Sequence, residues 1–358
     1  MLIDREVLLG NLQRMQAYAE AQGVALRPHT KTHKMPRIAR MQVAQGACGI
    51  AVAKVGEAQV MAENGLEDIF IANEIVGLPK LERIRRLAET REIAFGVDTP
   101  CQVEAAEQVF ANADKPAQVL IEIEVGENRS GIIEEADFIR LLETIRRCPH
   151  VAFKGLFSHD GNSYGAADRE ACAQSFLESQ RRTLHFAQLA RAQGMEPRVV
   201  SIGSTPSLVY QLPILPGITE LRPGTYALMD ASQAHAEGTL AHCAATVLAT
   251  VISRPTAERV ILDVGAKGIT MQERTQGICA TPGKGTIWGR PDVHIHQVYD
   301  EHAILYHKGF HDSVQVGDKV RILPVHICPV CNLYDEAVLI SGDQVAEVVP
   351  ILCRGKLQ

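Results

Sequence analysis

Eight short apolar runs alternate with amphipathic segments through the first two-thirds of the chain. The runs lie near Val24–Leu26, Gly49–Val52, Ile69–Ala72, Ile93–Val97, Val119–Val125, Phe153–Phe157, Val199–Ile202 and Glu220–Leu221. Between them apolar residues recur every three or four positions, as in Leu78–Glu89, Ala136–Arg147 and Ala171–Gln193, a spacing typical of helices with one buried face. Eight strand–helix units over about 230 residues predict an N-terminal (β/α)8 barrel. A doubly wound sheet is less favoured, because no Gly-x-Gly-x-x-Gly turn follows an early strand.

The pattern changes after Ala234. Later segments are rich in β-branched residues and are separated by turns; they lie near Ala244–Ile252, Arg259–Asp263, His294–Tyr299, Lys319–Val325, Glu336–Ile340 and Val345–Ile351. Such a change predicts a separate all-β domain. We expect a barrel over residues 4–236 and a β domain over residues 237–358, with residues 1–3 adding a strand to the β domain.

Composition excludes several classes of protein. The 358-residue chain carries 36 basic and 42 acidic side chains without a dense basic run, so nucleic acid and anionic membranes are not expected partners. No apolar stretch of about 18 residues is present to span a membrane, and Asp4, Arg5 and Glu6 interrupt any signal-peptide pattern. Nine cysteines without an export signal predict buried or metal-binding thiols rather than a disulfide framework. We therefore expect a cytoplasmic globular protein.

A basic segment follows the first predicted strand. Residues 27–34 read Arg-Pro-His-Thr-Lys-Thr-His-Lys, at the strand end where reacting groups lie in a parallel barrel. A desolvated lysine loses its proton and can form a Schiff base with an aldehyde, which makes Lys31 a candidate catalytic residue. A solvent-exposed basic loop is the alternative that these residues leave open.

Other candidate groups follow later strands. The turns Gly203-Ser204-Thr205 and Arg222-Pro223-Gly224-Thr225-Tyr226 occupy loops that commonly bind phosphate in such barrels, although ordinary loop turns have the same composition. Arg129 follows the fifth strand and is suited to an anion. His159 and Tyr164 follow the sixth strand and are candidates for an acid, a base or a ring contact. Surface turns are the alternative for both.

Two pairs in the β domain have the spacing of metal ligands. Residues two apart in a strand face the same side, so His326 and Cys328 can bind one metal ion through imidazole and thiolate. A buried pair without metal is the alternative. His294 and His296 have the same spacing, but they lie far from the predicted barrel strands, and an exposed strand accounts for them.

In their order and placement these motifs resemble the pyridoxal-phosphate enzymes of the alanine-racemase fold, specifically the D-threonine aldolase and D-serine dehydratase family. The resemblance runs nearly end to end. The motifs that carry it are residues 27–34, 128–131, 159–164, 203–206, 300–302 and 324–328. It implies a barrel that holds pyridoxal 5'-phosphate, a C-terminal β domain, a D-3-hydroxy amino acid as substrate, and a homodimer whose active sites lie near the subunit interface.

The resemblance also implies roles for individual residues. The residues that match cofactor-binding positions are Lys31, Arg129, Tyr164, Ser204, Thr205, Gly224 and Tyr226. Among them Lys31 matches the Schiff-base lysine and Arg129 an arginine near the cofactor ring. His326 and Cys328 match the ligands of a divalent metal ion, with Zn, Mn, Mg or Co as the candidates. Arg222 matches an arginine that contacts the pyridine nitrogen in alanine racemases, and its role here stays open.

Two branches of this family fit the chain. Residues 73–77, 300–302 and 332–333 resemble the aldolase branch, whereas Asn162-Ser163-Tyr164 resembles the dehydratase branch. We expect retro-aldol cleavage of D-threonine and related D-3-hydroxy amino acids to glycine and an aldehyde. His159 or a metal-bound water is available as the base for the hydroxyl. The alternative is a D-serine dehydratase that yields a keto acid and ammonia. A cofactor carrier would not need the β domain, and a metal-dependent hydrolase would place a His-x-His pair after an early strand.

Overall fold

The computed structural model describes residues 1–358, which divide into two compact units. The barrel unit consists of Arg14–Lys31, Pro36–Gly224 and Gly355–Gln358. The β unit consists of Met1–Gln13, Thr32–Met35 and Thr225–Arg354. The chain therefore passes between the units several times, and helix α1 (Arg5–Ala21) begins in the β unit and ends in the barrel unit.

The barrel unit is built on eight parallel strands. They are β2 (Ala25–Leu26), β3 (Ile50–Val52), β4 (Asp68–Glu74), β5 (Glu92–Val97), β6 (Ala117–Glu122), β7 (Val151–Phe157), β8 (Val199–Ile202) and β9 (Glu220–Leu221). Their order is β2-β9-β8-β7-β6-β5-β4-β3, and a parallel bridge between His29 and Ala51 joins the two ends of the sheet. The predicted barrel-like sheet, with a strand at each of the eight apolar runs, is confirmed.

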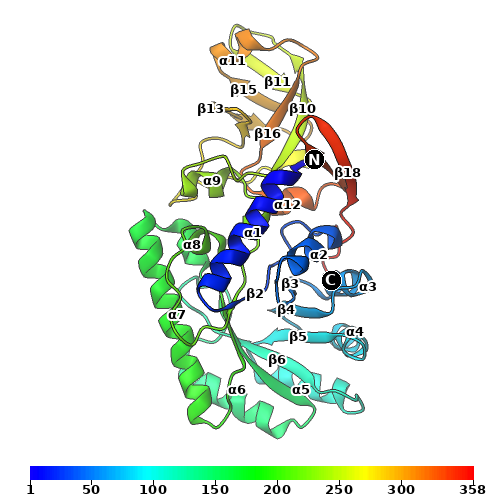
Figure 1. Ribbon diagram of the computed structural model, residues 1–358, viewed down its shortest axis with the longest axis vertical. Helices are drawn as coiled ribbons and strands as arrows, with labels where there is room; N and C mark the ends of the chain where they lie inside the picture. The colour runs from blue at the N-terminus through cyan, green and yellow to red at the C-terminus, as the bar shows by residue number, and fades with distance from the viewer. The chain divides into compact units, whose positions relative to one another are not determined.

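Helices lie between these strands along the chain. They are α2 (Pro36–Ala44), α3 (Val55–Glu63), α4 (Leu78–Ala88), α5 (Pro100–Phe110), α6 (Glu135–Arg147), α7 (Arg169–Ala192) and α8 (Thr205–Val209), with a 3-10 turn η1 (Gly161–Gly165). Figure 1 shows α4, α5, α6 and α7 along the outside of the curled sheet. In α6 the buried side chains Phe138, Leu141, Leu142 and Ile145 follow the three- and four-residue spacing that predicted this helix.

The interior of the barrel is filled by apolar side chains from several strands. Phe70 of β4 and Phe157 of β7 meet edge to face, with ring centroids 5.1 Å apart. Ala51, Ala94 and Leu120 complete this buried cluster. The barrel is therefore a packed core, and its reactive groups must lie in the loops at the strand ends.

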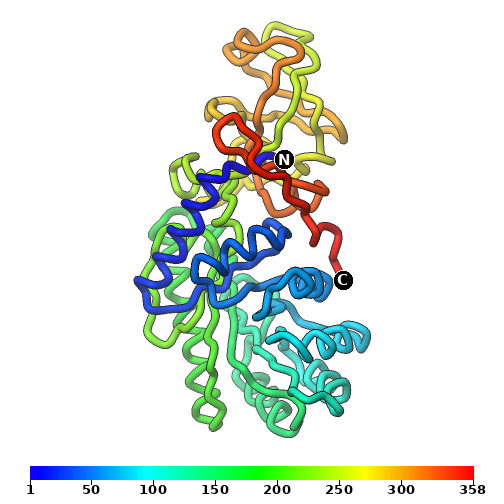
Figure 2. Tube along the Cα trace, turned by 45° about the vertical axis from the view of Figure 1, so that its right-hand side comes forward, coloured from blue at the N-terminus to red at the C-terminus, as the bar shows by residue number.

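The β unit contains ten strands. They are β1 (Leu2–Asp4), β10 (Ala245–Ser253), β11 (Arg259–Leu262), β12 (Thr286–Ile287), β13 (Arg290–His294), β14 (Gln297–Val298), β15 (Ala303–Tyr306), β16 (Lys319–Leu323), β17 (Glu336–Ser341) and β18 (Gln344–Pro350). The main order is β13-β12-β16-β10-β1-β17-β18. The N-terminal strand β1 pairs with β10 and, in parallel, with β17, and Figure 2 shows the blue and red segments side by side.

Short helices interrupt this unit. They are the 3-10 turn η2 (Thr225–Ala227), α9 (Ala231–Glu237), α10 (Ala266–Ile269), α11 (Lys308–Ser313) and α12 (Ile327–Cys331). The continuous strand predicted over His294–Tyr299 is wrong, because the fully buried Ile295 directs its backbone N–H to Gly285 and accepts from Lys284. Strand β13 therefore ends at His294 and β14 begins at Gln297. No helix in the chain is both long and apolar enough to cross a bilayer.

A substitution at Gly155 tests the close pairing of β7 with β8. It lies opposite Val199, and a Cβ at this position would overlap the Val199 carbonyl oxygen. We expect Gly155→Ala to lower the free energy of unfolding by about 3 kcal/mol, measured by chemical denaturation. Gly10→Ala is the control, because a Cβ there meets nothing within 4 Å. Equal stability of the two variants would contradict this packing.

Candidate active site

Lys31 follows strand β2 at the end where the barrel opens. Backbone bonds hold the segment before it: the His29 N–H donates to the Pro223 carbonyl (2.8 Å) and the Thr30 N–H to the Ala51 carbonyl (2.8 Å). The segment is thus fixed between the residues that follow β9 and those of β3. The Lys31 side chain is half-buried, so the exposed basic loop considered above does not describe it.

Cations gather around Lys31. Burial, together with the charges of Lys31 and Arg222, holds the pKa of His29 well below its ordinary value. Burial, Lys31 and Arg129 do the same to the pKa of His159. Both imidazoles are therefore neutral at physiological pH. Lys31, Arg129 and Arg222 thus lie near two uncharged rings, and Glu122 and Glu127 pair with Arg129 at 3.5 Å and 3.2 Å. An anionic ligand could exchange for these carboxylates.

His159 presents one defined nitrogen as a base. Its Nδ1 lies 3.1 Å from the Gly203 carbonyl oxygen, which can only accept a hydrogen bond. Nδ1 must therefore carry the hydrogen, and Nε2 of the neutral ring has the free lone pair. Tyr164, on the η1 turn, has its ring centroid 6.5 Å from that of His159. The two rings thus lie near each other in the segment after β7.

The two glycine-containing turns lie side by side. The Arg222 N–H donates to the Ile202 carbonyl (2.8 Å), which joins the ends of β8 and β9. Gly203 has φ +126°, and a Cβ on it would stand 3.3 Å from the Arg222 nitrogen, so this turn needs glycine. Ser204 and Thr205 are buried at the start of α8 and Gly224 follows β9, whereas Tyr226 is buried in the β unit.

Asp160 determines what Ser204 can do in this turn. The buried carboxylate oxygen Oδ2 accepts from the hydroxyls of Ser204 (2.9 Å), Ser163 (2.8 Å) and Ser207 (2.5 Å). A serine has one hydroxyl hydrogen, so Ser204 in this arrangement cannot also donate it to a phosphate. The backbone N–H groups at the start of α8 are the remaining donors there. Sequence reasoning missed Asp160, although it directly follows a strand end.

Arg222 is held by protein groups. Its Nη1 donates to the Ser201 hydroxyl (2.6 Å) and its Nη2 to the Ser158 carbonyl (2.7 Å). Its guanidinium lies 5.8 Å and 5.3 Å from the ring centroids of Phe70 and Phe157. Burial lowers its pKa to about 10, so the group stays charged. It contributes fixed positive charge beneath the mouth.

A pair of carboxyl groups lies at the ends of β4 and β6. Glu122 accepts from the Ser130 hydroxyl (2.9 Å) and faces Arg129 at 3.5 Å. Burial, a hydrogen bond to Glu122 and that neighbour's charge raise the pKa of Glu74 to about 9. Glu74 is therefore protonated and uncharged at neutral pH. Glu74 and Glu122 are the last residues of β4 and β6, so they lie at the same strand ends as the loops that carry the other site residues.

The raised pKa of Glu74 makes the stability of the protein depend on pH. Its proton leaves the unfolded chain near the ordinary pKa of 4.5 but is retained in the folded chain up to about pH 9. The free energy of unfolding therefore falls as the pH rises between these values. We expect Glu74→Gln to gain melting temperature relative to the wild type from pH 5 to pH 9. The exposed Glu82→Gln is the control. Parallel plots of melting temperature against pH for the wild type and Glu74→Gln would contradict the retention of the Glu74 proton.

The β unit brings His326 and Cys328 together, but not on a strand. The predicted strand is wrong here: His326 is the N-cap of the short helix α12, and Cys328 lies in its first turn. Cys328 Sγ lies 3.2 Å from Thr32 Oγ1 and 3.5 Å from Thr225 Oγ1. Burial opposes ionisation of Cys328, but His326 and these hydroxyls lower its pKa to about 7. The same contacts raise the pKa of His326 to about 10, so the two side chains form a thiolate–imidazolium pair. A soft or borderline metal ion would displace the ring proton and bind both side chains.

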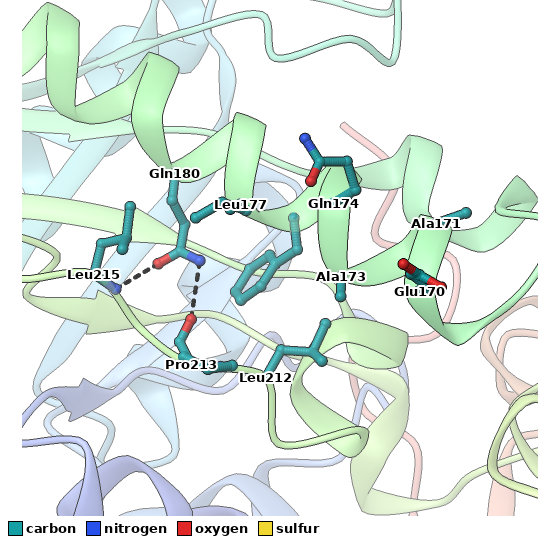
Figure 3. Close-up of a pocket in the computed structure, with 10 residues that line it drawn as sticks. Glu170, Ala171, Ala173, Gln174, Leu177, Gln180, Leu212, Pro213 and Leu215 are labelled. Carbon is teal, nitrogen blue, oxygen red and sulfur yellow. Dashed lines mark hydrogen bonds between the residues drawn. The ribbon is translucent and has the colours of Figure 1, made fainter.

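The other metal-ligand pair considered above and a further hollow offer less. No group of three or more His, Cys, Asp or Glu side chains is arranged to hold a metal ion by itself. His294 Nδ1 is 3.1 Å from Thr286 Oγ1, and His296 is exposed. A hollow of about 490 Å³ lies between α7 and residues 212–215 (Figure 3), but Glu170 is its only titratable lining group. Figure 3 shows Gln180 bonded to the backbone of that segment, so its amide is engaged.

Comparison with known proteins agrees with this architecture. Residues 3–232 match the N-terminal domain of alanine racemase, and residues 244–340 match a serine dehydratase domain. The fold and site thus define an enzyme of the pyridoxal-phosphate, alanine-racemase-like fold. A D-threonine aldolase of an Arthrobacter species is 34% identical over 99% of this chain and 92% of its own length. The chain belongs to the family of D-threonine aldolases and D-serine dehydratases, as its motifs predicted.

Solved structures in this family are closely similar. The D-threonine aldolase from Filomicrobium marinum has a TM-score of 0.90 at 29% identity, covering 100% of this chain and 95% of that one. The D-threo-3-hydroxyaspartate dehydratase from a Delftia species has a TM-score of 0.90 at 27% identity, covering 98% of this chain and 96% of that one. Relatives with this architecture therefore include both lyase types.

Proposed function

We propose that this chain is a pyridoxal-phosphate- and divalent-metal-dependent aldolase that cleaves D-threonine and related D-3-hydroxy amino acids to glycine and an aldehyde. The observation that carries the proposal is the neutral His159, with Nε2 unprotonated, among the cations around Lys31. An aldol cleavage needs a base for the substrate hydroxyl, and this ring can supply one at neutral pH. The 34% identity to a D-threonine aldolase supports the same conclusion.

The residues of the barrel mouth fit pyridoxal phosphate. Lys31 is the amine for its aldehyde, and Arg129 and Arg222 are the cations nearby for its anionic groups. The phosphate would be held by backbone N–H groups at Ser204 and Thr205, near Gly224. Arg129 and Tyr164 are the proposed neighbours of the ring, and Tyr226 is proposed as a further phosphate contact. When bound, the cofactor withdraws electrons from the substrate Cα, so that a bond to Cα can break.

His159 controls the proton of the β-hydroxyl in this proposal. Nε2 takes that proton while Nδ1 keeps its bond to the Gly203 carbonyl, so the ring does not rotate as it becomes charged. The C–O bond becomes the carbonyl of the aldehyde as the Cα–Cβ bond breaks. A proton then returns to Cα to give glycine. The nearby cations, which keep His159 neutral beforehand, also favour its rapid deprotonation afterwards.

His326 and Cys328 are the proposed metal ligands. Solved structures of D-threo-3-hydroxyaspartate dehydratase include a cysteine-to-alanine mutant in a metal-free form and a histidine-to-alanine mutant. The two mutated positions lie two apart, as His326 and Cys328 do. Imidazole and thiolate favour Zn or Co over Mg, with Mn between them. The ion would act as a Lewis acid towards the substrate hydroxyl.

Dehydration is the second candidate, because Asn162-Ser163-Tyr164 and the similarity to the Delftia enzyme favour it. In this reaction Lys31 removes the α-proton and the β-hydroxyl departs, which yields a keto acid and ammonia. The two reactions use the same residues but differ in which proton is removed first. In the aldol cleavage His159 removes the hydroxyl proton, whereas in the dehydration Lys31 removes the α-proton.

Product analysis with D-threonine and D-serine tests the proposal. The protein is supplied with pyridoxal phosphate and a divalent metal. We expect glycine and acetaldehyde from D-threonine, and a His159→Gln variant should lose at least about 100-fold in kcat, because it lacks the base. Keto acid and ammonia without glycine would overturn the aldolase and establish the dehydratase.

Metal removal tests the metal requirement independently of pyridoxal-phosphate binding. Exhaustive chelation should abolish turnover and leave the visible absorption of bound pyridoxal phosphate unchanged, since Lys31 does not depend on His326 or Cys328 for its bond to the aldehyde. Readdition of Zn, Co or Mn should restore activity. Full activity after chelation would contradict the metal requirement.

A further inference from the structure

A buried carboxylate supports the proposed metal ligand His326. Asp230 is fully buried, and its Oδ2 lies 2.9 Å from His326 Nδ1. We propose that Asp230 is the positioning residue of the metal site: it fixes Nε2 of His326 as the ligand atom and supplies a second negative charge. This inference rests on the proposed function, because it assumes that His326 and Cys328 bind a divalent metal.

The hydrogen bonds around Asp230 fix the orientation of the His326 ring. Oδ2 also accepts from the Ile327 N–H (3.1 Å), the residue next to His326, so the ring and its backbone are tied to one oxygen. Oδ1 accepts from the Ser232 hydroxyl (2.8 Å) and the Gln233 N–H (2.9 Å). A carboxylate engaged by four donors cannot rotate without losing several bonds at once. Nδ1 therefore keeps its hydrogen, and only Nε2 is available to a metal.

Local backbone strain also places Asp230. Met229, directly before it, has φ +53° although it is not glycine, and its side chain is fully buried. Such a conformation is unfavourable for a bulky residue and persists only where surrounding contacts enforce it. The Met229 N–H donates to the Thr225 carbonyl at 2.7 Å, which closes this turn. Thr225 also contacts Cys328, so one turn positions groups around both proposed ligands.

The charge balance gives Asp230 a second role. The proposed ligands bring one thiolate charge to a divalent ion, and no third acidic ligand completes the cluster. Asp230 adds one charge at hydrogen-bond distance from a ligand, and it forms an ion pair with His326 at 2.9 Å. A carboxylate behind a ligating histidine raises the basicity of the ring, and loss of such a partner typically lowers metal affinity 10- to 100-fold.

Cobalt titration of the metal-depleted, pyridoxal-phosphate-loaded protein tests this role. Asp230→Asn keeps the shape of the side chain, but the amide nitrogen that replaces one carboxylate oxygen cannot accept a hydrogen bond. Either His326 Nδ1 or the Gln233 N–H at the start of α9 therefore loses its acceptor, and the negative charge is lost. We expect its Co²⁺ dissociation constant from calorimetry to rise about 10- to 100-fold, with the same visible Co²⁺ spectrum at saturation. Ser232→Ala is the matched control, because it removes a bond to Oδ1 only, and its affinity should change less than about 3-fold.

Four outcomes decide the inference. An unchanged affinity in Asp230→Asn overturns it, as does an equal loss in Ser232→Ala. If Asp230→Asn does not fold, histidine-selective ¹⁵N NMR of the wild type with Zn²⁺ replaces it: metal at Nε2 with Nδ1 protonated supports the inference, and metal at Nδ1 overturns it. A wild type that binds Co²⁺ but does not cleave the substrate overturns the proposed function while this inference stands.

Discussion

The parallel closure of the barrel is the constraint on which the rest of this protein depends. Because neighbouring strands all run in the same direction, the segments that follow them reach the same rim. Backbone bonds make this arrangement rigid at Lys31: His29 is tied to the end of β9, and Thr30 is tied to β3. A lysine that is far from Arg129 and Arg222 in the sequence is thereby held among their charges.

Burial and nearby charges determine which titratable groups at this rim are charged and which are neutral. Cations and burial keep His29 and His159 neutral, so a histidine there can accept a proton. Burial and the neighbouring Glu122 keep Glu74 protonated at neutral pH, so Glu74 offsets none of the positive charge. The mouth therefore contains three cations that could bind an anion, together with an uncharged base. A chemistry that begins by removing a proton from a neutral hydroxyl is suited to such a site.

Much of the fold follows from local sequence patterns, whereas the site follows only in part. Short apolar runs identified all eight barrel strands, and helical spacing identified helices between them, because each pattern reflects which faces are buried. The strand-end rule pointed to Lys31 and His159. The same reasoning failed at His326 and Cys328, where a turn of helix replaces a strand and still brings the two side chains together.

The supporting acids were out of reach for a different reason. Asp160 and Asp230 act through hydrogen bonds to serines and a histidine whose hydroxyl and ring directions depend on tertiary packing. Periodicity carries no information about such directions. Composition did not distinguish these residues from the many surface carboxylates. Only the folded chain shows that each of them occupies a buried position with several donors around one carboxylate.

The most direct test of this account is the location of the cofactor on the chain. The protein is incubated with pyridoxal phosphate, reduced with borohydride to make the lysine–cofactor bond permanent, digested and analysed by mass spectrometry. The account predicts one pyridoxyl group per chain, on Lys31, and none in a Lys31→Ala variant. Labelling at another lysine, or equal labelling of the variant, would contradict it.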